Sequence, residues 1–157
     1  MVDSFPMTPE GCEKLKERLE HLRKVRRPEI VKAIEEARSH GDLSENAEYH
    51  AAKEEQGFIE AKIRELEYKI GHAKVIDPKR IKSDEVTFGA TVTIKDIETE
   101  RVVTYKIIGS DEADSKNGSI SIDSPLARAL IGYKAGDSIF VGDDDPKEFS
   151  ILSLKYE

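Results

Sequence analysis

Apolar residues in the first half of the chain recur every three or four positions, the spacing of one face of an α-helix. The pattern predicts helices over residues 8–41 and 44–73, the first opening at Thr8-Pro9. Pro28 interrupts the first helix and predicts a kink or a lost hydrogen bond there. The second stripe alternates steps of four and three, the spacing of a two-helix seam, at Ile59, Ile63, Leu66, Ile70 and Ala73.

The connection between the two predicted helices is very short. It contains only residues 41–43, and a loop of that length forces the helices to run antiparallel. Roughly thirty residues per helix, at a rise of 1.5 Å each, give a hairpin about 45–50 Å long. We therefore expect residues 1–76 to form an antiparallel two-helix coiled-coil hairpin with its tip at residues 41–49.

The pattern changes near Asp77-Pro78, after which short runs rich in Val, Ile, Thr and aromatic residues alternate with Gly, Asp and Asn turns. Ser124-Pro125 suits the start of a short helix over residues 126–131. Residues 77–157 are predicted to form a small antiparallel sheet with one short helix, so the chain belongs to the α+β class. The expected strands are residues 86–94, 102–108, 119–122, 138–141 and 149–156.

Composition and charge restrict the classes of partner and compartment. Of 157 residues, 36% are charged and the net charge is −7, which argues against a protein that binds bare duplex with its whole surface. Contact with nucleic acid held by a larger partner remains open. The single cysteine, Cys12, excludes an internal disulfide and a Cys-rich zinc site. With no visible secretory signal or membrane-spanning run, we expect a cytoplasmic protein.

Three carboxylates, Asp42, Glu45 and Glu48, lie at or beside the tip of the predicted hairpin. One interpretation is a capping box, in which Asp42 caps the amide of Glu45 and Glu45 reaches back. The other is that two hard oxygen ligands are presented together at an exposed point. Such a pair can share one Mg²⁺ ion but needs further ligands from a partner to hold it. The spacing permits both interpretations.

The segment GDLSENAEYHAAKEEQGFIE, residues 41–60, closely resembles the tip of the bacterial GreA/GreB transcript-cleavage factors. Leu43 and His50-Ala51-Ala52 are similar to the GreA branch. Further motifs extend the resemblance over nearly the whole chain: VRRPEIVKAIEEARSHGD before the tip, then AKVID, FGATVTI, DEAD and SPLARALIG. The resemblance implies an N-terminal coiled coil that enters the secondary channel of RNA polymerase, and an FKBP-like C-terminal domain that docks at the channel mouth.

The same resemblance implies a function, which is to rescue backtracked or stalled RNA polymerase by stimulating its own Mg²⁺-dependent cleavage of the RNA 3′ end. Asp42 and Glu45 match the family's two essential acidic residues, which would help to hold a Mg²⁺ ion or position the attacking water. The active site would belong to the polymerase, so we expect an activator that is not itself an enzyme. The expected partners are RNA polymerase and the nascent RNA, without a membrane, and the expected state is a monomer that binds Mg²⁺ only weakly alone.

Other positions match family motifs but have simpler alternatives. Arg38 and Lys53 match a basic patch proposed to touch the RNA 3′ end, although ordinary solvated helix charge explains them equally. Asp123-Ser124-Pro125 match a segment implicated in docking on the polymerase, while Ser124 and Pro125 also suit a helix start. Tyr49 is either packed beneath the tip or a stacking surface for a base.

Three rival functions remain. The first is a regulator that binds the secondary channel of RNA polymerase without stimulating cleavage. Known regulators of that kind carry a zinc-binding cysteine cluster or a denser acidic tip, and neither matches this sequence. The second is a coiled-coil adaptor or chaperone, which would not require both acidic tip residues. The third, prolyl isomerase activity, rests on fold analogy alone, and the C-terminal half has few aromatic residues to line a pocket.

Overall fold

The computed structural model describes residues 4–41 and 45–157, which divide into two compact units. The first unit, called the arm below, comprises Cys12–Ala73, and the second, called the body, comprises Ser4–Gly11 and Lys74–Glu157. The division falls near the predicted boundary between residues 76 and 77, but it assigns the first described residues to the body. No helix in the described ranges has the length and apolar character needed to cross a membrane.

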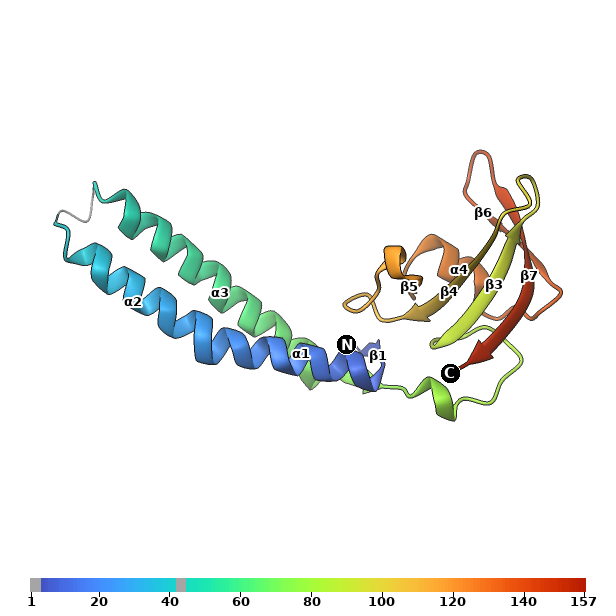
Figure 1. Cartoon of the computed structure of the whole chain (residues 1–157), viewed down its shortest axis with the longest axis horizontal. Helices are drawn as coiled ribbons and strands as arrows, with labels where there is room; N and C mark the ends of the chain where they lie inside the picture. Colours follow the sequence, from blue (N-terminus) through green and yellow to red (C-terminus); the bar gives the residue numbers. More distant parts are fainter. Residues whose placement is uncertain (1–3, 42–44) are drawn as a thin grey trace. The chain divides into compact units, whose positions relative to one another are not determined.

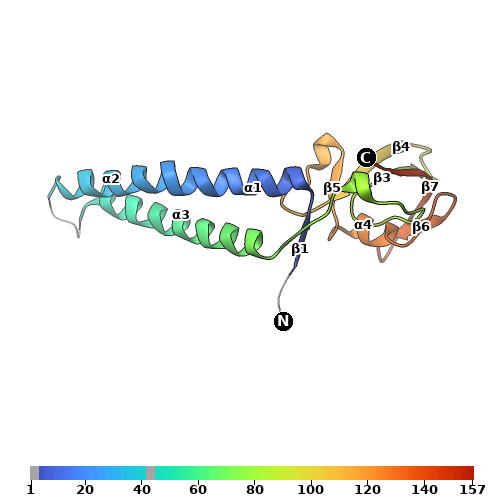
Figure 2. The ribbon, with the colours of Figure 1, turned by 90° about the horizontal axis from the view of Figure 1, so that it is seen from below.

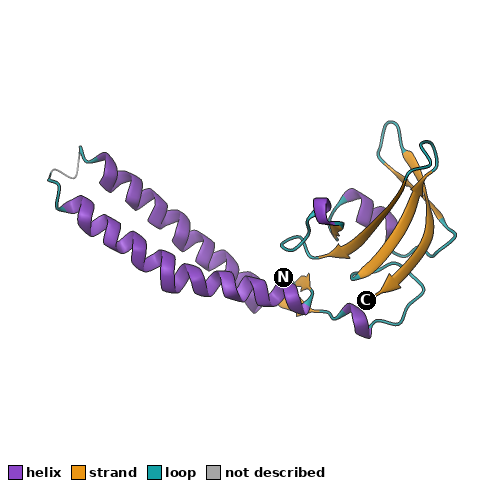
Figure 3. Cartoon of the chain, viewed as in Figure 1, coloured by secondary structure: helices purple, strands orange, loops and turns teal. Residues whose placement is uncertain are grey.

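The arm is a long helical hairpin (Figures 1 and 3). One side contains α1 (Pro9–His21), the π-helical turn η1 (Leu22–Arg26) and α2 (Arg27–Arg38), and the other is α3 (Ala47–Gly71). This confirms the predicted hairpin, whereas the detailed side-chain interlocking of a coiled coil stays a prediction. Aliphatic residues at helical spacing form its buried seam: Leu15, Leu19, Ile30, Ile34, Ala37, Ala52, Ile59, Ile63 and Leu66.

The first side of the hairpin is irregular before Pro28 rather than at it. Pro28 lies within the first two residues of α2, and the preceding η1 is π-helical, with the Arg27 amide donating to the Leu22 carbonyl. Proline has no amide hydrogen for the carbonyl four residues back, that of Lys24, and its ring crowds that carbonyl. The helix accommodates this in the wider i→i−5 turn just before the proline.

The body contains a five-stranded mixed sheet in the order β5-β4-β3-β7-β6. The neighbours β4–β3, β3–β7 and β7–β6 are antiparallel, but β5 runs parallel to β4, so the prediction of a wholly antiparallel sheet was wrong. The connection from β4 passes through the turn η3 (Ser115–Asn117) before β5 begins, which allows the parallel direction. The strands are β3 (Ala90–Asp96), β4 (Val102–Ile108), β5 (Ser119–Ser121), β6 (Ser138–Val141) and β7 (Lys147–Tyr156).

The core of the body lies between the curled sheet and the short helix α4 (Pro125–Leu130) (Figure 2). The predicted strand at 86–94 begins only at Ala90, because Gly89 has a φ of +89°, which side chains rarely adopt. Val86 instead exchanges hydrogen bonds of 2.8 Å with the backbone of Gly132 and Tyr133, after α4. The buried core residues are Val86, Ala90, Val92, Ile94, Ile107, Ile120, Ala127, Leu130, Ile139 and Ile151.

Two short strands that the sequence did not predict, β1 (Phe5–Met7) and β2 (Ala73–Val75), pair with each other, and the turn η2 (Pro78–Arg80) follows β2. Beside β1, Glu112 of the DEAD segment accepts hydrogen bonds from the amide of Thr8 at 2.8 Å and its hydroxyl at 2.5 Å. The Thr8 hydroxyl in turn accepts from the Gly11 amide at 3.0 Å. Glu112 thereby holds the first turn of α1 within the body.

Candidate functional site

The predicted tip carboxylates lie where α2 ends and α3 begins. Asp42, together with Leu43 and Ser44, lies outside the described residues. Glu45 is exposed and sits in a bend just before α3. Its carboxylate forms no hydrogen bond or ion pair with any other residue that the structure describes.

The capping-box interpretation was wrong for Glu45. The predicted helix start at residue 44 moves to Ala47, and the N-cap is Asn46, whose Oδ1 accepts a hydrogen bond from the Tyr49 amide at 3.0 Å. A capping box requires its glutamate inside the first helical turn. Since Glu45 precedes the N-cap, it cannot act as the third residue of this helix.

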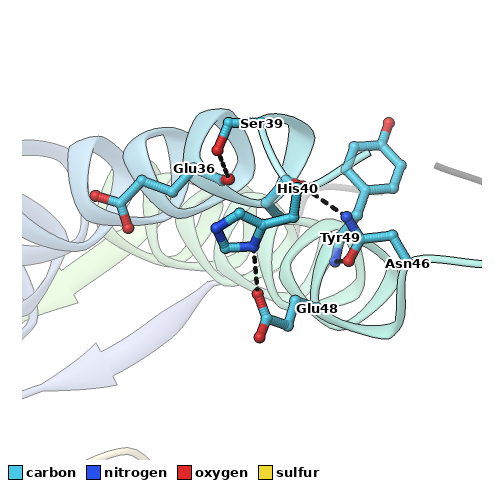
Figure 4. A network of polar contacts seen from close by, with 7 residues as sticks. Glu36, Ser39, His40, Asn46, Glu48 and Tyr49 are labelled. Carbon is cyan, nitrogen blue, oxygen red and sulfur yellow. Dashed lines mark hydrogen bonds and ion pairs between the residues drawn. The ribbon is translucent and has the colours of Figure 1, made fainter. Parts of the chain in front are cut away.

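A small polar network joins the end of α2 to the start of α3 (Figure 4). Asn46 Nδ2 donates to the Ala37 carbonyl at 2.6 Å, and His40 Nδ1 lies 3.2 Å from Glu48 Oε2. The His40 and Glu48 side chains are 62% and 73% exposed, so their contact contributes little to stability. The sequence pattern identified Glu48 as a tip carboxylate but gave no signal for either cross-helix contact.

Arg38 and Lys53, the predicted basic patch, are both exposed and each contacts another residue of the arm. The Arg38 guanidinium carbon lies 5.9 Å from the centroid of the half-buried Tyr49 ring, within range of a cation–π interaction. This contact supports packing as the role of Tyr49. Lys53 Nζ lies 3.3 Å from Gln56 Oε1, one turn further along α3.

Ion pairs between the helices hold the arm in register. Arg27 donates two hydrogen bonds of 2.8 Å to the Glu60 carboxylate, and Arg23 lies 3.2 Å from Glu67. From the first pair to the second, the residue number of the arginine decreases while that of the glutamate increases, as expected for antiparallel helices. Hydrogen bonding to Arg27 lowers the pKa of Glu60, and the same contact raises the pKa of Arg27.

The described part of the tip offers too few ligands to hold a metal ion alone. No group of three His, Cys, Asp or Glu side chains suited to a metal occurs among the described residues. Glu45 nevertheless fits the demands of Mg²⁺, which prefers oxygen ligands and usually takes only one or two carboxylates from a protein. A Mg²⁺ ion bound to Glu45 would require further ligands from outside the described residues.

The predicted docking segment belongs to the body, whereas the tip belongs to the arm. Ser124 Oγ accepts from the Ala127 amide at 3.2 Å, and Pro125 occupies the first turn of α4, which confirms the helix-start interpretation. Asp123 donates its amide to Ser121 Oγ at 3.1 Å. Asp123 and Pro125 are exposed, so both side chains are available to a partner.

The body also has a hollow that the sequence did not predict. Two aromatic residues, Tyr105 and Phe149, help to line it, although few aromatic residues were expected there. They come from β4 and β7, on either side of β3, so only the strand order brings them together. The volume is about 320 Å³, and the lining residues are Ile94, Asp96, Arg101, Val103, Tyr105, Leu126, Lys147 and Phe149.

Both halves of the chain match one family. The family model for the N-terminal region of GreA/GreB transcription elongation factors matches residues 5–75, and that for the C-terminal region matches residues 81–156. Transcription elongation factor GreA from Thermodesulfovibrio yellowstonii is 52% identical over 158 residues, with 100% of both chains covered. That from Syntrophotalea carbinolica is 55% identical over 157 residues, with 99% of each covered. The solved structure of GreA factor homolog 1 from Thermus thermophilus is 25% identical, covers 97% of this chain and 99% of its own, and has a TM-score of 0.45.

Proposed function

Because this chain belongs to the GreA/GreB family of transcription elongation factors, we propose that it stimulates RNA cleavage by a backtracked or stalled RNA polymerase. The arm would enter the secondary channel of the polymerase and bring the tip to its active site. The bonds broken would be in the nascent RNA, at the polymerase's own catalytic centre. The chain would therefore act as an activator.

The observation that carries this proposal is the exposure of Glu45 at the bend just before α3. A carboxylate that only served the fold would accept hydrogen bonds from the helix start, a role that Asn46 fills instead. Glu45 is exposed, and none of its interactions involves another described residue. Its oxygens, with those of Asp42, would complete a Mg²⁺ site together with polymerase ligands.

The dimensions of the arm suit this role. α3 contains 25 residues, which at 1.5 Å per residue gives a helix about 37 Å long. In the described part of the arm, α3 lies beside a single continuous helical side formed by α1, η1 and α2, a slender form that would suit a channel. A Mg²⁺ ion held jointly by Glu45, Asp42 and the polymerase would activate the attacking water and stabilise the leaving oxygen.

Two further groups of residues would support the interaction. Arg38, held against the Tyr49 ring, and Lys53 would contact phosphates near the RNA 3′ end. In the body, the exposed Asp123 and Pro125 would contact the polymerase, while Ser124 caps α4. These residues would orient the factor and strengthen binding, and Glu45 and Asp42 would affect the chemistry.

The test is cleavage of RNA in stalled elongation complexes by the wild-type chain, Asp42→Asn, Glu45→Gln and the double variant, each at saturating concentration. We expect the double variant to reduce cleavage to the level of polymerase alone, because amides lack the negative charge that a metal ligand needs. Stability should change little, because a substitution at an exposed residue such as Glu45 usually shifts it by about 0.5 kcal/mol or less. Thermal unfolding of the same preparations measures that change.

Glu48→Gln is the matched control, since it makes the same chemical change at a carboxylate paired with His40. We expect it to support near-normal cleavage. Robust cleavage by the double variant would contradict the proposed mechanism. Tight polymerase binding by a wild-type chain that stimulates no cleavage would instead support the regulator alternative.

A further inference from the structure

Asn46 makes two hydrogen bonds with one short side chain, one to each helix of the arm (Figure 4). Its Oδ1 accepts from the Tyr49 amide at 3.0 Å, in the first turn of α3. Its Nδ2 donates to the Ala37 carbonyl at 2.6 Å, in the last turn of α2. Asn46 is half-buried and Ala37 is only 3% exposed, so the bridge lies at the sheltered base of the tip.

Both partners of Asn46 are groups that a helix end leaves without a regular helical hydrogen bond. In a continuing helix, the Ala37 carbonyl would accept from the Gly41 amide, which instead donates to Arg38 at 3.4 Å. The Ala37 carbonyl accepts from the His40 amide at 3.2 Å, and its second lone pair accepts from Asn46 Nδ2. The Tyr49 amide lies too early in α3 to have a helical acceptor. An asparagine amide has both a donor and an acceptor, so one side chain can satisfy both ends.

We propose that Asn46 is a positioning residue for the reaction, because it joins the last turn of α2 to the first turn of α3 directly after Glu45. Glu45 is bonded directly to Asn46, whose backbone is extended with φ −85° and ψ 97°. The two hydrogen bonds of Asn46 therefore fix the position of the backbone from which the Glu45 side chain extends. The exposed contact between His40 and Glu48, at 3.2 Å, also joins these helix ends, and it is weaker than the Asn46 bridge.

This inference rests on the proposed function, and it differs from ordinary helix capping in what it demands of residue 46. A cap needs only an acceptor, which aspartate and serine provide about as well as asparagine. The bridge also needs a donor that reaches Ala37. Asn46→Asp keeps the cap, but places a carboxylate oxygen near the Ala37 carbonyl. Asn46→Ser keeps a neutral cap, with a side chain too short for both bonds.

The experiment measures RNA cleavage in stalled elongation complexes with full-length variants, over a range of factor and Mg²⁺ concentrations. We expect Asn46→Asp and Asn46→Ser to lower the maximal cleavage rate about 10- to 100-fold, because small displacements of reacting groups have effects of that size. The factor concentration giving half-maximal cleavage should stay unchanged. The Mg²⁺ concentration giving half-maximal cleavage should rise, a change that a purely structural role would not produce.

Asn117→Asp is the matched control, because Asn117 also donates a side-chain hydrogen bond, to Asp114 Oδ2 at 2.7 Å, but in the body. It should retain the wild-type maximal rate. A wild-type maximal rate in Asn46→Asp would overturn the inference. A wild-type maximal rate in the neutral Asn46→Ser variant would also overturn it, because any loss in Asn46→Asp would then come from its negative charge. A loss confined to factor affinity would also overturn it. A wild-type chain that stimulates no cleavage would contradict the proposed function itself, and with it this inference.

Discussion

The arm and the body bury their apolar residues in different ways. In the body, side chains from five strands and α4 meet around one centre, with Val86, Ala127 and Leu130 fully buried. In the arm, two helices share a single row of aliphatic residues, such as Ile63 and Leu66. Charged pairs flank that row, and the bonds from Arg27 to Glu60 are shorter, at 2.8 Å, than the 3.4 Å between Lys134 and Asp84 in the body.

This difference follows from geometry. A two-helix hairpin has no third layer, so each seam residue has neighbours on one side only and much of each helix faces water. Ion pairs and helix caps therefore contribute a larger share of the specificity in the arm than in the body. The arm gains length and a slender form, which the proposed function needs, and its structure depends more on charge.

The largest expected effect comes from removing one buried leucine from each unit. Leu130→Ala in the body and Leu66→Ala in the arm delete the same atoms at positions 0% and 1% exposed. Such changes cost about 2–5 kcal/mol, depending on how far the surroundings can collapse. We expect Leu130→Ala near the upper limit, since sheet and helix enclose it, and Leu66→Ala near the lower, since two helices can approach.

Urea denaturation distinguishes the two variants. Far-ultraviolet circular dichroism follows mainly the long helices of the arm. Near-ultraviolet circular dichroism in a Tyr49→Phe, Tyr68→Phe background, which removes the two arm tyrosines, follows the sheet through the body tyrosines. Leu130→Ala should shift the tyrosine transition more than Leu66→Ala shifts the helical one. A larger free-energy loss for Leu66→Ala would contradict this account of the two cores.

The sequence predicted best the elements whose pattern repeats over several turns or strand positions. The seam around Ile59, Ile63 and Leu66 predicted α3. Runs rich in Val, Ile, Thr and aromatic residues between turn residues predicted β4 and β6 with the bounds observed. The parallel direction of β5 could not be predicted, because it depends on which edge of the sheet is still unpaired where the chain reaches β5. The strands β1 and β2 have only three residues each, too few to show a period.

Within the candidate site, the sequence identified the chemistry but not the support beneath it. Glu45 was identified by its carboxylate and by the resemblance of its surroundings to a family. The bond from Asn46 to Ala37 spans nine positions and exists only because a turn brings two helix ends together. No periodicity encodes such a contact, and the same holds for Arg38 over the Tyr49 ring.

A smaller effect should appear when acid weakens the arm's ion pairs. Hydrogen bonding to Arg27 lowers the pKa of Glu60, and hydrogen bonds from Lys69 and then Lys62 lower that of Glu65. A carboxyl group with a lower pKa in the folded state stabilises fully above its unfolded pKa and loses that contribution as pH falls through the folded value. The arm should therefore lose stability below about pH 4.3, the ordinary glutamate value.

Thermal unfolding followed by the helical signal, from pH 7 down to pH 3, measures this loss. Glu60→Gln should lower the midpoint at pH 7 and reduce its dependence on pH, because the titrating partner of Arg27 is gone. Glu54→Gln is the matched control, at an exposed glutamate of α3 that has no ion pair with a described residue. Equal pH dependence in wild type and Glu60→Gln would show that this pair contributes nothing measurable, as many exposed pairs do.

The smallest expected effect concerns the turn between β3 and β4, and it should be confined to the body. Glu100 has a φ of +62°, although left-handed backbone costs an ordinary residue about 1–2 kcal/mol. Its amide donates to the Asp96 carbonyl at 2.8 Å, which holds the conformation in place. Glu100→Gly removes the strain but gives the unfolded chain more freedom, which offsets about 0.5–1 kcal/mol of the gain. The net result should be a stabilisation of less than about 1 kcal/mol.

Glu98→Gly is the matched control. It lies in the same turn but without a positive φ, so it has only the entropic cost and should destabilise the body. Opposite signs in the tyrosine-detected transition, with the helical transition unchanged, would confirm that this strain belongs to the body alone, whereas equal losses would show that Glu100 is not strained.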